Sequence, residues 1–244
     1  MSKLSDRIRR TTRTEPAPLG FGLHAAAAQA PSMLIVVRTE VGKVADAAKA
    51  GADAVIIEGD PGKLKETGGL IVGAPAGNSG SQAAAALREK GVDFLVVGVG
   101  DGNAAAMLDE KLGFVVQLGE ADLDDVRLRV VGELGIDAII LPAPESPVSV
   151  ARLIEFRRIA GLVRAPVLVE ADAGIDASLL HVLRDSGTAG VIVSSASKLG
   201  DLKERIASLP ARGGRRDKGE DHDTALVPTA VGHGHDEDDD DYDD

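Results

Sequence analysis

The stretch KAGADAVII at residues 49–57 decides the fold, because three further segments repeat its design: KGVDFLVV at 90–97, LGIDAII at 134–140 and SGTAGVIV at 186–193. Each segment starts at the expected end of a helix, passes through a glycine, and enters an apolar run two or three residues later. We expect the glycine to adopt the left-handed conformation that ends a helix and turns the chain. A repeated helix-to-strand turn predicts a fold built from successive βα units.

Eight short apolar runs lie between residues 33 and 208: 33–37, 54–58, 70–73, 94–98, 114–118, 138–141, 167–170 and 190–194. They are nearly continuous rather than alternating, which is typical of parallel strands buried on both faces. The stretches between them favour helices at 41–50, 82–90, 103–111, 121–134, 148–163, 176–186 and 199–209. Segment 59–68 is too short and too rich in glycine and proline for a full helix.

Eight successive βα units predict an α/β fold, a compact closed (β/α)8 TIM barrel over residues 33–210. The repeated segments lead into every second strand, which is the periodicity that an evenly built barrel leaves in its sequence. An open doubly wound sheet is the alternative. That fold often carries a glycine-rich loop after its first strand, whereas the sequence here continues as RTEVG at 38–42.

Two segments of different composition flank the barrel. Residues 1–32 form an N-terminal extension that we expect to cap the barrel. Leu4 and Ile8 share one face of a solvated first helix there, the alternative being a basic arm that touches an anionic partner. Segment 18–23 is a candidate extra strand or plug. Residues 211–244 hold 12 of the 39 Asp and Glu residues and four of the 27 Lys and Arg residues, so most of the net charge of −12 belongs to this tail. This composition predicts a disordered acidic tail.

Composition also disfavours several classes of protein. The chain has no cysteine, which excludes disulfides and thiolate chemistry and fits a reducing compartment, so we expect a cytoplasmic protein. No stretch approaches the roughly 20 consecutive apolar residues of a membrane helix. The first residues lack the apolar core of a secretory signal. Nucleic-acid binding is disfavoured because the chain is acidic and only 2% aromatic.

A barrel of this type carries its chemistry at the carboxyl ends of its strands. No histidine stands at these ends and no strand contains a lysine, which disfavours a histidine base and a Schiff base. Two carboxylate pairs with i, i+2 spacing remain, Glu58 with Asp60 and Glu170 with Asp172. Residues two apart on a strand point the same way, so we expect each pair to converge on the mouth.

These groups suggest three kinds of role. The predicted acid and base groups are Glu58, Asp60 and Glu170. Clustered carboxylates also suit Mg²⁺, with Glu58 and Asp172 as candidate ligands. Arg38 and Gln117 are candidate substrate-binding residues. The alternative is that the acids are solvated loop charges or helix caps, because Asp60 and Asp172 each precede a turn or helix.

The last two units carry the most specific motif. APVLVEADAGID (165–176) and GTAGVIVSSAS (187–197) resemble the closing units of aldolase-type, phosphate-binding (β/α)8 barrels, such as the ribulose-phosphate-binding enzymes and thiamine-phosphate synthase. Those families have a Gly-Gly-Ile turn after strand seven and a Gly-Ser-Ala turn after strand eight, whose backbone N–H groups hold a phosphate. Gly174 and Ile175 match the first turn, with Ala173 in place of the other glycine. Ser194, Ser195 and Ala196 match the second, with serine where glycine is usual.

The resemblance implies a lyase or isomerase that acts on a small phosphorylated metabolite, with the phosphate held at Gly174, Ser195 and Ser197. Several such barrels bind FMN at this place, a less favoured cofactor here than Mg²⁺. The alternative is a non-catalytic barrel that serves as a binding or assembly module and engages a protein partner through its acidic tail. Substrate, reaction and oligomeric state stay open. Convergence of Arg38, Glu58, Gln117 and Glu170 on one pocket would favour an enzyme.

Overall fold

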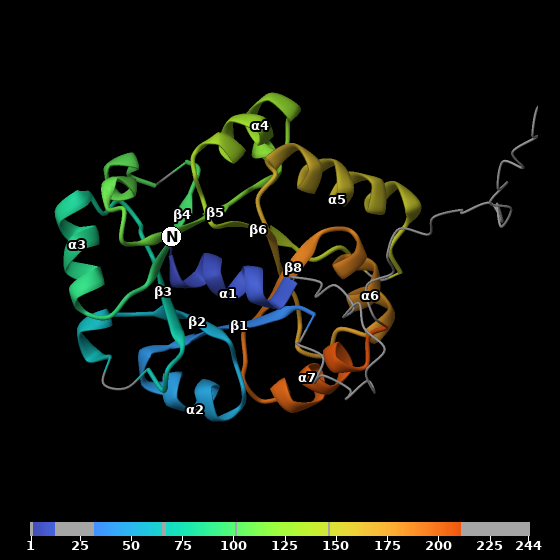
Figure 1. The fold of residues 1–244 in the computed structure, drawn as a ribbon, viewed down its shortest axis with the longest axis horizontal. Helices are drawn as coiled ribbons and strands as arrows, with labels where there is room; N and C mark the ends of the chain where they lie inside the picture. Colours follow the sequence, from blue (N-terminus) through green and yellow to red (C-terminus); the bar gives the residue numbers. More distant parts are fainter. Residues whose placement is uncertain (1, 13–31, 65–66, 101, 146, 211–244) are drawn as a thin grey trace, which may run out of the picture. The chain divides into compact units, whose positions relative to one another are not determined.

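Residues 2–12, 32–64, 67–100, 102–145 and 147–210 are described by a computed structural model of the chain. Within them, eight parallel strands close into one barrel in chain order, as Figure 1 shows. The predicted (β/α)8 barrel is therefore confirmed. The expectations for residues 18–23 and 211–244 fall outside the described residues. No helix among the described residues is long and apolar enough to cross a membrane.

The strands lie within a few residues of the predicted runs. They are β1 (Leu34–Glu40), β2 (Ala54–Glu58), β3 (Ile71–Pro75), β4 (Phe94–Gly98), β5 (Gly113–Gln117), β6 (Ala138–Pro142), β7 (Val167–Glu170) and β8 (Thr188–Val193). The barrel closes where β1 pairs in parallel with β8, from Leu34 opposite Gly190 to Val37 opposite Val193.

Helices cover the outside of the barrel and α1 lies at one end of it. The α-helices are α1 (Lys3–Thr12), α2 (Val44–Lys49), α3 (Ser81–Glu89), α4 (Asp125–Glu133), α5 (Val150–Val163), α6 (Ala177–Asp185) and α7 (Leu199–Ala207). Short 3-10 helices are η1 (Val41–Lys43), η2 (Pro61–Lys63), η3 (Ala104–Leu108) and η4 (Glu120–Asp122).

The helix predicted at 103–111 is wrong in type, because the structure has only the 3-10 helix η3 there. Asn103 caps its start by accepting a hydrogen bond from the Ala105 N–H at 3.0 Å. Asp109 follows its last residue and is engaged elsewhere, by Arg88 and by the Lys111 N–H, each at 3.0 Å. The chain thus leaves the helix after five residues instead of continuing to Lys111.

The glycines of the repeated segments have the predicted role. Gly51, Gly91, Gly135 and Gly187 have φ angles of 90°, 90°, 68° and 104°. These positive values are strained for residues with a Cβ, so glycine is favoured there. Each glycine ends the helical segment before an even-numbered strand and turns the chain toward that strand.

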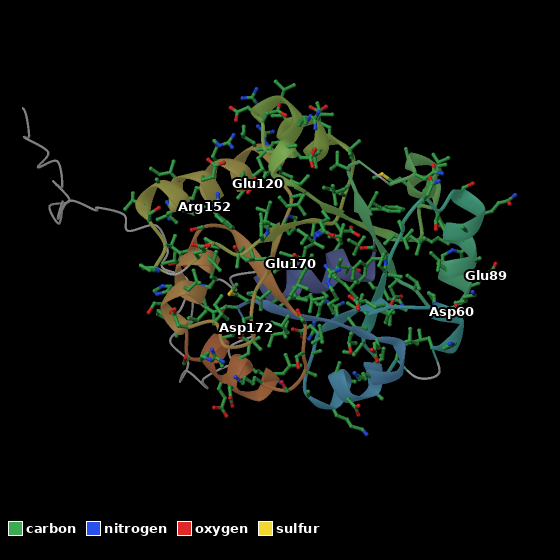
Figure 2. All side chains as sticks on the ribbon, turned by 180° about the vertical axis from the view of Figure 1, so that it is seen from behind. Asp60, Glu89, Glu120, Arg152, Glu170 and Asp172 are labelled. Carbon is green, nitrogen blue, oxygen red and sulfur yellow. The ribbon has the colours of Figure 1, made fainter. Side chains whose placement is uncertain are left out.

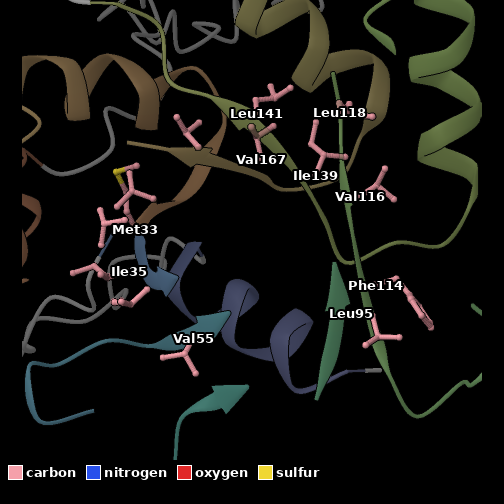
Figure 3. Packing of buried hydrophobic residues seen from close by; sticks show 14 of the residues in the cluster. Met33, Ile35, Val55, Leu95, Phe114, Val116, Leu118, Ile139, Leu141 and Val167 are labelled. Atoms are coloured by element: carbon pink, nitrogen blue, oxygen red, sulfur yellow. The ribbon is translucent and has the colours of Figure 1, made fainter. Parts of the chain in front are cut away.

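Two apolar clusters hold the barrel together. The outer cluster lies between strands and helices and includes Met33, Val55, Leu95 and Ile139, which Figure 3 shows. The inner cluster fills the barrel itself and includes Val36, Ile56, Phe94, Val115, Ile140, Leu168 and Ile192. The Phe94 ring leaves so little space beside β3 that a Cβ on Gly73 would lie 2.2 Å from its Cζ. Burial on both strand faces accounts for the continuous apolar runs in the sequence.

Helix α1 closes the base of the barrel, at the amino ends of the strands, and Figure 1 shows it across the ring of strands. Leu4 and Ile8 are 0% and 2% exposed and belong to the inner cluster. The helix itself was predicted correctly. The prediction that it is solvated is wrong for the face that carries Leu4 and Ile8. The physical reason is the size of the inner residues: Ala54, Ala138 and Ala189 of β2, β6 and β8 lie in the same cluster and leave space that Leu4 and Ile8 fill.

An aspartate precedes each of β2, β4 and β6, at the same place in three of the repeated segments, and each binds the backbone of the preceding strand. The Asp53 N–H donates to the Ile35 carbonyl at 2.8 Å, and Asp53 Oδ2 accepts from the Ile35 N–H at 2.9 Å. The same two bonds join Asp93 to Val72 and Asp137 to Phe114. These carboxylates therefore fix the register of neighbouring strands at the base.

The same three carboxylates also hold α1. Arg7 Nη2 lies 2.5 Å from Asp53 Oδ1, and Lys3 Nζ lies 2.7 Å from Asp93 Oδ1. The Ser2 hydroxyl donates to Asp137 Oδ2 at 2.6 Å. The fourth repeated segment has Ala189 at this place, and it packs in the apolar cluster with Leu4 and Ile8. The repeat thus provides polar anchors at three strands and an apolar contact at the fourth.

Removing the Leu4 side chain should destabilise the barrel strongly. We expect Leu4→Ala to lower the free energy of unfolding by about 2–5 kcal/mol, because it leaves a cavity in a fully buried cluster. Leu108→Ala is the control, since Leu108 is 75% exposed and its loss should change stability by no more than about 0.5 kcal/mol. Urea unfolding of the full chain measures both, and equal midpoints for the two variants would contradict this role of α1.

The base also predicts a pH dependence. Burial raises the pKa of Asp137 above its ordinary value, against the lowering effect of hydrogen bonds from Ser2 and Phe114. A raised pKa means that Asp137 contributes most to stability at low pH, and that this contribution is lost as pH rises through its folded-state pKa. The stability of Asp137→Asn relative to the parent chain should therefore increase as pH rises from about 4 through the raised pKa of Asp137. A flat or falling difference in urea unfolding would contradict it.

Candidate functional site

The alternation of side chains along each strand identifies which residues point into the barrel at its mouth. The mouth is the end of the barrel formed by the carboxyl ends of the strands. Residues two apart on a strand point to the same side. Val36, Ile56, Val115 and Leu168 belong to the inner cluster. The residues two positions further along these strands are Arg38, Glu58, Gln117 and Glu170. The four residues whose convergence was in question therefore share the inward face at the mouth.

One ion pair crosses this face. Arg38 Nη2 lies 2.5 Å from Glu170 Oε1, and the side chains are only 24% and 35% exposed. Arg38 lies on β1 and Glu170 on β7, the two strands that flank β8. Because Ile192 pairs with Val36 on one side and with Glu170 on the other, the ion pair spans the end of β8. Figure 2 shows Glu170 near the middle of the barrel.

The backbone around Glu170 is held on both sides. The Glu170 carbonyl accepts from the Ala143 N–H at 2.9 Å, and the next N–H, of Ala171, donates to the Ile192 carbonyl at 2.9 Å. Glu170 thus sits at the last paired position of a ladder that continues to β6 and to β8. A carboxylate on such a rigid strand end is held more precisely than one on a loop.

Glu58 and Gln117 lie on the inward face but stay exposed. Glu58 is the last residue of β2 and pairs in register with Glu40 of β1. Gln117 is the last residue of β5 and pairs in register with Gly98 and Ile140. Within the described part of the chain, the direct contact between members of this group is that of Arg38 with Glu170. The mouth therefore has one organised pair with additional polar groups around its rim.

Asp60 does not continue the inward face of β2. Strand β2 ends at Glu58, and Gly59, with a φ of 102°, turns the chain. Asp60 then caps η2 by accepting from the Gly62 N–H at 2.8 Å. This hydrogen bond, with Lys90 and Lys63 nearby, lowers the pKa of Asp60. Lys90 Nζ, just after α3, lies 3.8 Å from Asp60 Oδ1, and Figure 2 shows Asp60 away from Glu170. These contacts match the capping alternative.

The structure does not unite Asp172 with Glu58. Asp172 is exposed and follows the end of β7, where its Oδ1 accepts from the Gly174 N–H at 2.6 Å. Within the described ranges, no group of three or more His, Asp or Glu side chains is arranged to hold a metal ion. The described residues therefore do not present the clustered oxygen ligands on which the Mg²⁺ hypothesis depends.

The turn after β8 is also bonded within itself. The Ser195 and Ser197 hydroxyls lie 2.9 Å apart, and the Ser197 N–H donates to Ser195 Oγ at 3.2 Å. The structure therefore places the predicted phosphate-binding residues on two neighbouring loops, after β7 and β8. The N–H groups of Gly174 and Ser197 already have side-chain acceptors within those loops.

Sequence reasoning missed the residue that fixes the loop after β7. Arg205 of α7 donates through Nη2 to the Ala173 carbonyl at 2.8 Å and through Nη1 to the Ile175 carbonyl. The loop that contains Gly174 is thus tied to α7 from behind and to Asp172 from within. No local signal marks Arg205, which looks in the sequence like an ordinary charge on a helix surface.

Two hollows on the helical surface contain none of the predicted site residues. One, of about 420 Å³, is lined by Ser81 and residues 108–111. The other, of about 290 Å³, lies between the ends of α4 and α5 and is lined by residues that include Arg129, Glu133 and Arg164. Neither is part of the mouth.

Solved structures with the same fold include three that are named for phosphorylated compounds. They are 3-keto-L-gulonate-6-phosphate decarboxylase from Vibrio cholerae O1 biovar El Tor (14% identity, 73% of this chain and 99% of that chain, TM-score 0.54), thiamine phosphate pyrophosphorylase from Pyrococcus furiosus (16%, 72% and 96%, 0.54) and orotidine 5'-phosphate decarboxylase from Pyrococcus horikoshii OT3 (16%, 71% and 97%, 0.54).

Identities this low establish the fold alone. The barrel predicted from the eight βα units is confirmed, and the chain has the (β/α)8 fold that these proteins share. No protein-family model matches the sequence, and no curated protein sequence matches it.

The bond between Asp172 and Gly174 can be tested directly. In Asp172→Ala, the Gly174 N–H loses its acceptor, so we expect its amide hydrogen exchange to become at least about tenfold faster. The Ser197 N–H is the internal control, because its acceptor Ser195 is unchanged. Exchange measured by NMR would contradict the structure if both amides kept their rates, or if both changed equally.

Proposed function

We propose that this chain is an enzyme of the aldolase-type barrel class, a lyase or isomerase that acts in the cytoplasm on a small phosphorylated metabolite. The observation that carries the proposal is the half-buried pair of Arg38 and Glu170 at the mouth, above an interior filled with apolar side chains. Active sites of this fold lie at this end of the barrel. The fold shared with three proteins named for phosphorylated compounds supports the same class of substrate.

Each mouth residue has a role in this proposal. Glu170 is the acid or base, because it is positioned by the ladder and close to a cation. Glu58 is a second carboxylate on the same face, and Gln117 is a neutral hydrogen-bonding group. The loops with Gly174, Ser195 and Ser197 border the ion pair at β7 and β8 and contribute further substrate contacts. Asp60 is left out, since it caps η2.

A non-catalytic barrel is the second candidate, and one observation favours it. The N–H groups of Gly174 and Ser197 already donate to side chains of their own loops, so neither is free to bind a phosphate. In that case the barrel is a binding or assembly module, with a protein partner engaged through residues 211–244. Loss of a purified partner on deletion of those residues, with no turnover of any substrate, would support this function.

The enzyme proposal is tested by measuring turnover of a panel of sugar phosphates with ³¹P NMR. Glu170→Gln should lower kcat/KM by about 10²–10⁴, the usual contribution of a positioned acid or base. Glu155→Gln is the matched control, because Glu155 forms a comparable ion pair with Arg158 on α5, at 2.7 Å, away from the mouth. Absence of turnover across the panel, or equal activity of the two variants, would contradict the proposal.

A further inference from the structure

We infer that Arg38 binds the anionic group of the substrate, a phosphate monoester, and that the phosphate replaces Glu170 as the partner of Arg38. The inference rests on the proposed function, since it concerns the same mouth. It assigns the charged contact to Arg38 rather than to the loop N–H groups that the family resemblance implies. Binding of the anion then frees the Glu170 carboxylate beside the substrate.

Arg38 has donors to spare for a second anion. A guanidinium group has five N–H donors in a planar fork that suits two oxygens of a phosphate at once. Glu170 takes one of them, through Nη2 and a single carboxylate oxygen. The contact is therefore a single bond rather than the paired arrangement that an arginine makes with its best partners. A phosphate that reached the mouth would offer Arg38 more acceptors than Glu170 does.

The loop donors are poor competitors for the anion. The Gly174 N–H is bonded to Asp172, and a phosphate there would also meet the negative charge of that carboxylate. The Ser197 N–H is bonded to Ser195 Oγ. Using either amide requires breaking an existing hydrogen bond, and the positively charged group on these loops, Lys198 next to Ser197, is exposed. The loops can supply neutral hydrogen bonds from Ser195 and Ser197, whereas Arg38 supplies a full charge.

Glu170 explains how Arg38 stays at the mouth without a ligand. A half-buried charge needs a partner, and Glu170 supplies one across the end of β8. When phosphate takes over the guanidinium, the carboxylate loses its cation and lies close to the bound molecule. The phosphate and the Glu170 carboxylate compete for the Arg38 side chain. Binding of the anion is therefore linked to release of the proposed acid or base.

The test measures the binding of inorganic phosphate to the full chain by NMR titration at constant ionic strength. Glu170→Gln removes the internal competitor and its negative charge, so phosphate should bind roughly three- to tenfold more tightly. Arg38→Met should weaken binding by at least about tenfold, and Arg38→Lys should fall between it and the parent chain. Glu155→Gln is the control for loss of one negative charge elsewhere and should leave the affinity unchanged.

Three results would overturn the inference. The first is an unchanged affinity in Arg38→Met with a loss of binding in Gly174→Ala or Lys198→Met, which would place the anion on the loops after β7 and β8. The second is equal tightening in Glu170→Gln and Glu155→Gln, which would indicate a general charge effect. The third is no phosphate binding even in Glu170→Gln. Failure of the proposed function gives a different result. In that case phosphate binding still depends on Arg38, but no sugar phosphate is turned over.

Discussion

Three aspartate carboxylates at the base of the barrel are the interaction on which the rest of the structure depends. Asp53, Asp93 and Asp137 each join the backbone of a neighbouring strand to a side chain of α1 or, for Asp137, of Ser2 just before it. Ala54, Ala138 and Ala189 leave apolar space at the base of the barrel, and the chain must cover it. Leu4 and Ile8 cover it, and the carboxylates align the helix that carries them. One set of side chains thus fixes strand register and closes the core.

The charged and polar residues have different roles at the two ends of the barrel. The base uses its charged residues for structure, so each of those carboxylates already has a backbone partner and a side-chain partner in residues 2–7. The mouth has the opposite character, since Glu58 and Gln117 are exposed and Arg38 and Glu170 satisfy mainly one another. Groups held only by a mutual contact can exchange partners without loss of the fold. The proposed chemistry is therefore assigned to the mouth, and substitutions at the base should act on stability instead.

The sequence predicted the barrel well because its signals are local. A continuous apolar run marks every strand and a helix-ending glycine precedes every second one, and the strands lie within a few residues of their predicted places. The aspartates of the repeat were visible, but their role was not, because it depends on contacts with Ile35, Val72 and Phe114 and on α1 far away in sequence. At the mouth, strand alternation placed Glu58 and Glu170 on one face. It failed for Asp60, where Gly59 turns the chain, and nothing local pointed to Arg205 behind the loop after β7.

The most direct measurement is a crystal structure of the full chain grown with inorganic phosphate. The structure described here predicts phosphate density within hydrogen-bonding distance of the Arg38 guanidinium, with the Glu170 carboxylate turned away from it and with the Asp172–Gly174 bond intact. Phosphate bound by the Gly174 and Ser197 N–H groups, with the Arg38–Glu170 pair unchanged, would contradict it.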